Sequence, residues 1–275
     1  MIERRRIMGE SIEMVYDGLL CWFDGLDPNL TINSWPCSYG TQENVQYRSL
    51  HPQSRYNTTG SVVKLSNGIR LTATDDSRAV LYTYLSSSSS TRKENPLYNT
   101  TDTTIIIVAS NLLLSKASSP LYTLAGMATK SGTTPSIKRT RLFTNNSIGQ
   151  IQNWCGDGPT AATWDFAFQE NMRGVFATRM SMSQNKQDFT AIANDIRVDG
   201  GFKSGCKYDN LSDDRFLLGG YNYIGTYFYY DDNMPGGANF QCFPGDYHAL
   251  VIYNRILGDR ELTSVMKFLK ERYNV

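Results

Sequence analysis

The stretch that decides the fold lies near the end of the chain and reads Phe243-Pro-Gly-Asp-Tyr-His-Ala-Leu-Val-Ile-Tyr-Asn-Arg-Ile-Leu257. Successive side chains of a strand point to opposite faces of its sheet. In residues 247–254 both alternating sets are apolar or aromatic. We therefore expect a strand that is covered on both faces, with the segment that follows it as a candidate cover.

That following segment has the apolar spacing of a helix. Its apolar side chains recur at i, i+3, i+4, i+7 and i+11, which places them on one helical face; they are Leu262, Val265, Met266, Leu269 and Tyr273. Acidic residues Asp259 and Glu261 stand at the expected start, and basic residues stand near the expected end, namely Lys267, Lys270 and Arg272. This order of charges suits the dipole of a helix.

The rest of the chain predicts strands joined by polar turns. Short runs rich in apolar, aromatic and β-branched residues are expected as strands at 19–23, 62–65, 69–74, 79–85, 103–110, 121–129, 138–144, 164–168, 173–182, 188–193, 196–198, 215–219 and 223–230. The run 103–110 is apolar on both faces and predicts a central buried strand. Ser66-Asn67-Gly68 separates two runs, and Asn-Gly predicts a hairpin because both of its turn positions need positive φ.

Composition and charge exclude several classes of protein. The 275 residues include 27 basic and 26 acidic ones, and this balance argues against a generic binder of nucleic acid or of an anionic membrane. No run approaches the ~20 apolar residues of a membrane helix, and no secretory signal is recognised. Five scattered cysteines without C-x-x-C spacing predict reduced thiols in a protein that folds in a cytoplasm.

Several motifs in the last third occur in the order of a known family. They are 173–181, 188–193, 194–201 with its Val198-Asp-Gly-Gly201 turn, Phe216-Leu-Leu-Gly-Gly220 and 243–257. This order resembles the laminin-G-like, or concanavalin A-like, lectin/glucanase family. The resemblance implies an all-β fold, namely a two-sheet antiparallel jelly-roll sandwich with a short C-terminal α-helix. We assign residues 18–275 to this sandwich and residues 1–17 to an N-terminal arm.

The carboxylates do not show the family's glycanase pattern. Hydrolases of this superfamily carry E-x-D-x-E on one strand, where residues i and i+2 share a face and can meet one glycosidic bond. Here the acidic pairs are adjacent, as in Asp213-Asp214 and Asp231-Asp232, and Asp259/Glu261 suits a helix start. We therefore predict no catalytic residues and no enzyme. We interpret His51 as a loop residue and His248 as a hydrogen-bonded core histidine rather than a base.

Candidate binding residues gather in one aromatic segment. Aromatic residues crowd both faces of one expected strand there and acidic residues follow it, and the candidates are Tyr221, Tyr223, Tyr227, Tyr229, Asp231, Asp232 and Asn233. Their tyrosine faces suit sugar rings, while packing across strands explains the same residues without a ligand. No cofactor and no metal site is predicted, although the oxygens of residues 231–233 could bind calcium as an alternative to a polar turn.

The predicted role is a non-catalytic structural or adhesion protein of a bacteriophage virion. This expectation rests on a lectin-like sandwich without a recognised secretory signal. In the arm that precedes the sandwich, Arg4, Arg5 and Arg6 would dock on other virion proteins, although these arginines also suit a solvated terminus. A homo-oligomer and a cell-surface glycan partner are expected by analogy. The alternatives are a free carbohydrate-binding lectin module and a glycan hydrolase with relocated carboxylates.

Overall fold

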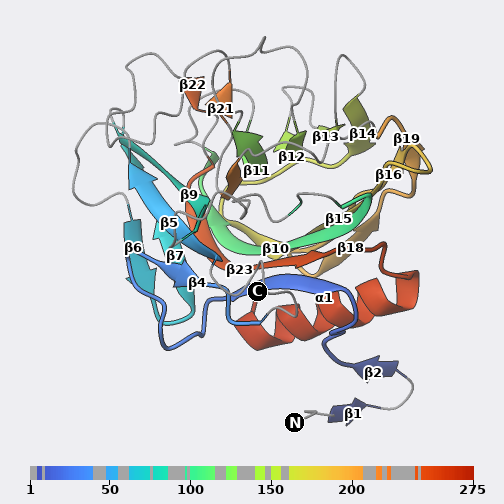
Figure 1. The fold of residues 1–275 in the computed structure, drawn as a ribbon, viewed down its shortest axis with the longest axis horizontal. Helices are drawn as coiled ribbons and strands as arrows, with labels where there is room; N and C mark the ends of the chain where they lie inside the picture. The colour runs from blue at the N-terminus through green and yellow to red at the C-terminus, as the bar shows by residue number, and fades with distance from the viewer. Residues whose placement is uncertain are drawn as a thin grey trace.

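A computed structural model describes most of the chain. The described residues are 5–7, 10–39, 48–54, 62–74, 77–85, 97, 100–114, 122–128, 140–145, 150–155, 161–206, 215–218, 222–223, 239–240 and 243–275. They form two large antiparallel sheets and one C-terminal helix, α1 (Asp259–Tyr273), which Figure 1 shows in three layers. The predicted two-sheet sandwich with a short helix is confirmed.

The inner sheet is the layer between the other sheet and α1. Its strand order is β18-β17-β15-β10-β23-β7-β6, while β3 pairs with β23, β16 with β15, and β19 with β16. Its strands are β3 (Leu19–Asp24), β6 (Val62–Leu65), β7 (Gly68–Leu71), β10 (Asp102–Leu112), β15 (Met172–Ser181), β16 (Lys186–Gln187), β17 (Thr190–Ala193), β18 (Ile196–Asp199), β19 (Lys203–Ser204) and β23 (Gly245–Tyr253).

The outer sheet has the order β14-β13-β12-β11-β20-β9-β5-β4, with β8 paired to β9. Its strands are β4 (Trp35–Pro36), β5 (Arg48–Ser54), β8 (Ala73–Thr74), β9 (Ser77–Leu85), β11 (Tyr122–Ala128), β12 (Thr140–Asn145), β13 (Gln150–Cys155), β14 (Ala161–Asp165) and β20 (Arg215–Leu218). Two small hairpins complete the fold: β1 (Arg5–Ile7) with β2 (Glu10–Ile12), and β21 (Asn222–Tyr223) with β22 (Asn239–Phe240).

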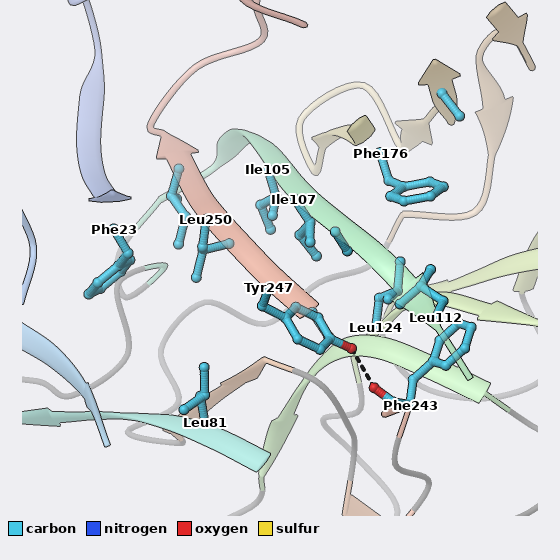
Figure 2. Close-up of a cluster of buried hydrophobic side chains, with 14 of the residues drawn as sticks. Phe23, Leu81, Ile105, Ile107, Leu112, Leu124, Phe176, Phe243, Tyr247 and Leu250 are labelled. Carbon is cyan, nitrogen blue, oxygen red and sulfur yellow. Dashed lines mark hydrogen bonds between the residues drawn. The ribbon is translucent and has the colours of Figure 1, made fainter. Parts of the chain in front are cut away.

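The central strands of the inner sheet, β3, β10, β15 and β23, are buried on both faces, as the apolar runs predict. In β10, Ile105 and Ile107 point into the cluster shared with the outer sheet, which also contains Leu81 and Leu124 (Figure 2). Ile106 lies in the second cluster, which is shared with α1. Alternating side chains of one strand therefore belong to two different cores, and a single strand ties the three layers together.

The stretch 243–257 contains a strand that is covered on both faces, as its sequence predicts. In β23, Leu250 and Ile252 face the outer sheet, while Ala249 and Val251 face α1. The predicted apolar face of the helix is the buried one, formed by Leu262, Val265, Met266, Leu269 and Tyr273. The Glu261 carboxylate accepts a hydrogen bond from the Gly258 N–H at 2.8 Å, which satisfies one backbone donor at the helix start.

Three local predictions need correction. The hairpin between β6 and β7 is confirmed, but Leu65 pairs with Gly68, so the turn residues are Ser66 and Asn67 rather than Asn67 and Gly68. His51 lies in strand β5, which pairs with β9, and not in a loop. The predicted strand 164–168 is displaced, because β14 ends at Asp165. Strand β13 was not predicted.

The N-terminal segment reaches the body through α1. The Glu13 N–H donates to the Ser264 hydroxyl at 2.9 Å, and the Tyr253 hydroxyl donates to the Val15 carbonyl at 2.9 Å. The hairpin β1–β2 lies beyond α1, on the side away from both sheets (Figure 1). Arg5 and Arg6 belong to β1, but Arg4 and the side chains of the arginines fall outside the described residues. Their docking role stays a prediction.

Candidate functional site

The aromatic segment proposed as a binding surface falls almost wholly outside the described residues. Only Tyr223 of the candidate set is described, as a backbone position in β21. The other candidates, Tyr221, Tyr227, Tyr229, Asp231, Asp232 and Asn233, are not described. This platform therefore stays a prediction.

A different pair of exposed aromatic residues is described. Tyr16 is 52% exposed and Tyr39 is 45% exposed, and their rings meet edge to face with centroids 6.4 Å apart. The Tyr39 ring stacks on buried Trp22 at 4.8 Å. We call Tyr16 and Tyr39 the tyrosine pair. It is a surface aromatic platform with a rigid indole beneath it.

Backbone bonds fix the tyrosine pair beside the inner sheet. The Trp22 N–H donates to the Tyr39 carbonyl at 2.9 Å, and the Ser38 N–H donates to the Trp22 carbonyl at 2.9 Å. The Ser38 hydroxyl also donates to the Asp27 carboxylate. These bonds hold residues 38 and 39 along β3, so the Tyr39 ring is positioned before any ligand arrives.

Charged and polar groups line the underside of this platform. The Arg272 guanidinium lies 5.2 Å from the centre of the Trp22 ring and donates to the buried Asp24 carboxylate at 2.6 Å. The Tyr273 hydroxyl donates to the same carboxylate at 2.6 Å. Burial, together with the Asp24 charge, raises the pKa of Tyr273, so this phenol remains a donor.

A second group of polar side chains lies on the helix-side face of the inner sheet. We call it the polar corner; its members are Arg70, Ser110, Asn111, Asp246 and His248. Asp246 accepts from Arg70 at 2.5 and 2.8 Å and from Asn111 at 2.6 Å. His248 contacts Ser110 through Nε2 at 2.8 Å and the Asn67 carbonyl through Nδ1 at 2.9 Å. The prediction of a hydrogen-bonded core histidine is confirmed.

Two glycines permit the close backbone approach at this corner. A Cβ on Gly25 would lie 2.3 Å from the Asn67 carbonyl oxygen, and one on Gly68, where φ is +157°, would lie 2.2 Å from the Tyr247 carbonyl oxygen. Neither position has room for a side chain. The β6–β7 turn can therefore pack closely against β23, which brings the Asn67 carbonyl to His248.

The buried imidazole predicts weaker folding in acid. Burial lowers the pKa of His248 below its ordinary value, while the Asp246 charge acts in the opposite direction. Below about pH 6.5 the unfolded chain takes up a proton that the folded chain resists, so the free energy of unfolding should fall with decreasing pH. Urea unfolding at pH 7.5 and 5.5 measures this fall. His248→Gln should lose less stability over the same interval, and an equal loss would contradict the assignment.

A metal site and a membrane helix are both absent from the described part of the chain. Within the described residues, no group of three His, Cys, Asp or Glu side chains is placed to hold a metal ion. The same residues contain no helix that is long and apolar enough to cross a membrane.

Sequence patterns could not find these two sites. Tyr16 lies in the segment assigned to the arm, and Tyr39 lies in a polar stretch without periodicity. Trp22 carried a signal as an aromatic residue of a predicted strand, and His248 carried one as a predicted core histidine. Ser110 and His248 are 138 residues apart, so only the pairing of β10 with β23 brings them together.

Comparison with known proteins rests on structure alone. No family model and no curated protein matches this sequence. Trypanosoma rangeli sialidase in complex with sialic acid matches with a TM-score of 0.57 and 13% identity, over 98% of this chain and 36% of the sialidase. A mutant of that sialidase displaying trans-sialidase activity matches with a TM-score of 0.58 and 13% identity, over 96% of this chain and 34% of its own.

The fold is a lectin-like β-sandwich. The predicted lectin-like sandwich is confirmed, while membership of the concanavalin A-like or laminin-G-like family stays a prediction. The CBM40 domain of Ruminococcus gnavus IT-sialidase, bound to α2,3-sialyllactose, also matches, with a TM-score of 0.42 and 14% identity over 61% of this chain and 83% of that domain. The chain spans about a third of the length of the Trypanosoma rangeli sialidases.

The prediction that the chain is not an enzyme is wrong. Solved structures that match nearly its whole length include sialidases, one of them a mutant displaying trans-sialidase activity. A missing E-x-D-x-E motif speaks only against glycanases that use that strand, and it does not exclude enzymes from this fold. The comparisons give no support to the virion role.

Proposed function

We propose that this chain binds carbohydrate and that the tyrosine pair is its contact surface. The observation that carries the proposal is the stack of Tyr39 on Trp22, with Tyr16 at its edge. A sugar has apolar C–H faces that fit an aromatic ring and hydroxyls that need hydrogen-bond partners. The stack offers the ring, and the neighbouring Asp27 and Ser38 offer polar partners.

The platform suits binding because little of it must be ordered by the ligand. Ring stacking and the backbone bonds that residues 38 and 39 make with Trp22 already hold Tyr39, so binding does not have to order a mobile side chain. Trp22 is 2% exposed and lends rigidity from below. Exposed aromatic residues with supporting polar groups are the usual anchors of recognition surfaces.

The comparisons support this proposal through the fold. Sialidases share the sandwich over nearly the whole chain, and one of them is described with sialic acid bound. At 13% identity this likeness supports a shared fold, and experiment must identify the ligand. Glycan binding is the function that the sandwich and its exposed tyrosine pair support together.

A glycan array with the full chain tests the proposal. We expect Tyr39→Ala to weaken binding about tenfold or more, because an anchoring aromatic side chain usually contributes more than 1 kcal/mol. Tyr39→Phe keeps the ring and should bind nearly as well as the wild type. Tyr227→Ala and Tyr229→Ala test the platform that the sequence predicted. Equal binding by the wild type and Tyr39→Ala would contradict the tyrosine pair as the contact surface.

Hydrolysis is measured in the same samples. Release of reducing sugar or of sialic acid from glycans that bind would extend the proposal to an enzyme. Binding without release leaves the proposed contact surface intact.

The virion role remains a separate prediction. Under this prediction, mass spectrometry of purified particles detects this chain, and residues 1–17 attach it to another particle protein. Absence from purified particles would remove it.

A further inference from the structure

We propose that Ser110 and His248 form a nucleophile–base pair that cleaves small carboxylic esters. This site belongs to the polar corner and is independent of the tyrosine pair. The proposal follows from how two strand irregularities, one backbone carbonyl and one hydroxyl are arranged around the buried imidazole.

Two β-bulges converge on this pair. Between β10 and β23 the partners change from Val108↔Ala249 to Ala109↔Tyr247, so His248 is an extra residue in β23. Between β10 and β15 the register shifts again after Ala109, which leaves one extra residue in β10 before Leu112. Bulges re-aim side chains and are frequent beside active sites.

The second bulge also carries an unusual backbone conformation. Asn111 has φ +49°, in the left-handed region that non-glycine residues seldom adopt. It follows Ser110 directly and binds Asp246 at 2.6 Å. As a result, the consecutive residues Ser110 and Asn111 both reach polar partners on β23. Asparagine tolerates this backbone region better than other non-glycine residues, so the bulge can be formed here.

The hydrogen bonds determine the direction of proton transfer. A carbonyl oxygen only accepts, so the 2.9 Å contact with the Asn67 carbonyl places the proton of neutral His248 on Nδ1. Nε2 is then the acceptor, and the Ser110 hydroxyl donates to it at 2.8 Å. A serine that donates to an imidazole oriented by a third group is the arrangement that activates a hydroxyl nucleophile.

Burial keeps this imidazole neutral, because it lowers the pKa of His248, while the Asp246 charge acts in the opposite direction. The groups that face it are Asp246 on its own strand, Arg70 on β7 and the Tyr273 ring of α1, whose centre lies 6.0 Å away. Ser110 is half-buried and Asn111 is exposed. The proposal therefore has a small acyl group approach the hydroxyl from the side of the exposed Asn111, whereas His248 itself is covered.

The reaction balances without a cofactor. The Ser110 oxygen bonds to the ester carbonyl carbon as its proton moves to Nε2 of His248. The ester C–O bond then breaks, and the alcohol leaves with that proton. Water attacks the acyl-serine, again losing a proton to Nε2, and the carboxylic acid is released with the serine restored. One ester and one water give one acid and one alcohol.

A fluorophosphonate probe on the full chain tests the pair, because it bonds to activated serines with loss of fluoride. We expect one adduct per chain, mapped by mass spectrometry to Ser110 and absent in Ser110→Ala. Ser183→Ala removes an exposed serine and should label as the wild type does. His248→Gln should label at least a hundredfold more slowly, since a general base contributes about 10²–10⁴ in rate.

The pH profile provides a readout that does not depend on a foldable histidine variant. With a neutral imidazole as base, the wild-type labelling rate should be nearly constant between pH 7 and 9. A serine that reacts through hydroxide alone would label about tenfold faster per pH unit. No adduct on Ser110 in the folded chain, such a steep profile, or equal labelling after denaturation in urea would each overturn the proposal.

Discussion

Asp188→Ala is expected to lower the free energy of unfolding by about 3–5 kcal/mol, because it leaves a buried guanidinium without its main partner. Arg179 is 6% exposed and Asp188 is 1% exposed. The Asp188 carboxylate accepts from Nε of Arg179 at 2.7 Å and from its backbone N–H at 2.7 Å. Arg179 also donates to the Leu257 carbonyl and to Asp259. Arg179 therefore joins β15 to the start of α1, and Asp188 holds it in place.

An exposed ion pair provides the matched control. Asp195 bonds Lys270 at 2.7 Å and Arg173 at 3.3 Å, but its side chain is 59% exposed. Such pairs contribute little, so Asp195→Ala should change stability far less than Asp188→Ala. Urea unfolding of both variants measures the difference. Similar losses in the two would contradict a buried network that holds the helix to the sheet.

Ile106→Ala and Ile107→Ala should each cost about 2–5 kcal/mol, although the two residues are neighbours in one strand. Ile106 lies in the core shared with α1, and Ile107 lies in the core shared with the outer sheet. Both side chains are fully buried. Each substitution leaves a cavity in a different core, so neither can be relieved by the same rearrangement.

Ile196→Ala is the control for this pair. Ile196 is 66% exposed on β18, and its truncation should change stability by no more than about 0.5 kcal/mol. The three variants remove the same atoms from three environments of one sheet. A small effect for Ile106 with a large one for Ile107 would mean that α1 does not cover the inner sheet as described.

Much of the fold follows from local patterns in the sequence. The alternation in β10 and β23 predicts strands buried on both faces, and the spacing of Leu262, Val265 and Leu269 predicts the helix face that covers one of them. These signals are strong because an apolar run of strand length that is rich in β-branched residues indicates a buried strand, whereas an apolar period of 3.6 residues indicates a helix. Local sequence patterns do not predict the order in which the strands pair, and this order is known only from the structure.

The missed features have physical reasons. Strand β5 contains His51 and Pro52, and proline usually marks a turn or an open sheet edge. Strand β13 is polar at Gln150, Gln152 and Asn153, and its buried Asn153 is satisfied by Thr178 of the opposite sheet. Neither strand shows the apolar alternation from which strands are predicted.

The candidate sites were harder to foresee than the fold. The tyrosine pair depends on residues 38 and 39 running along β3 outside any predicted strand, and the polar corner depends on bulges that shift the register by one residue. A one-residue shift changes which face a side chain occupies. Motif spacing cannot reveal a site that is made by such a shift.

Hydrogen exchange measured with a bound glycan tests the central claim most directly. With saturating amounts of a glycan selected on the array, the account predicts slower exchange in peptides covering residues 13–18 and 37–39, and no change in those covering residues 221–233. Protection confined to residues 221–233, or no protection in either region while the glycan is bound, would contradict the tyrosine pair as the binding surface.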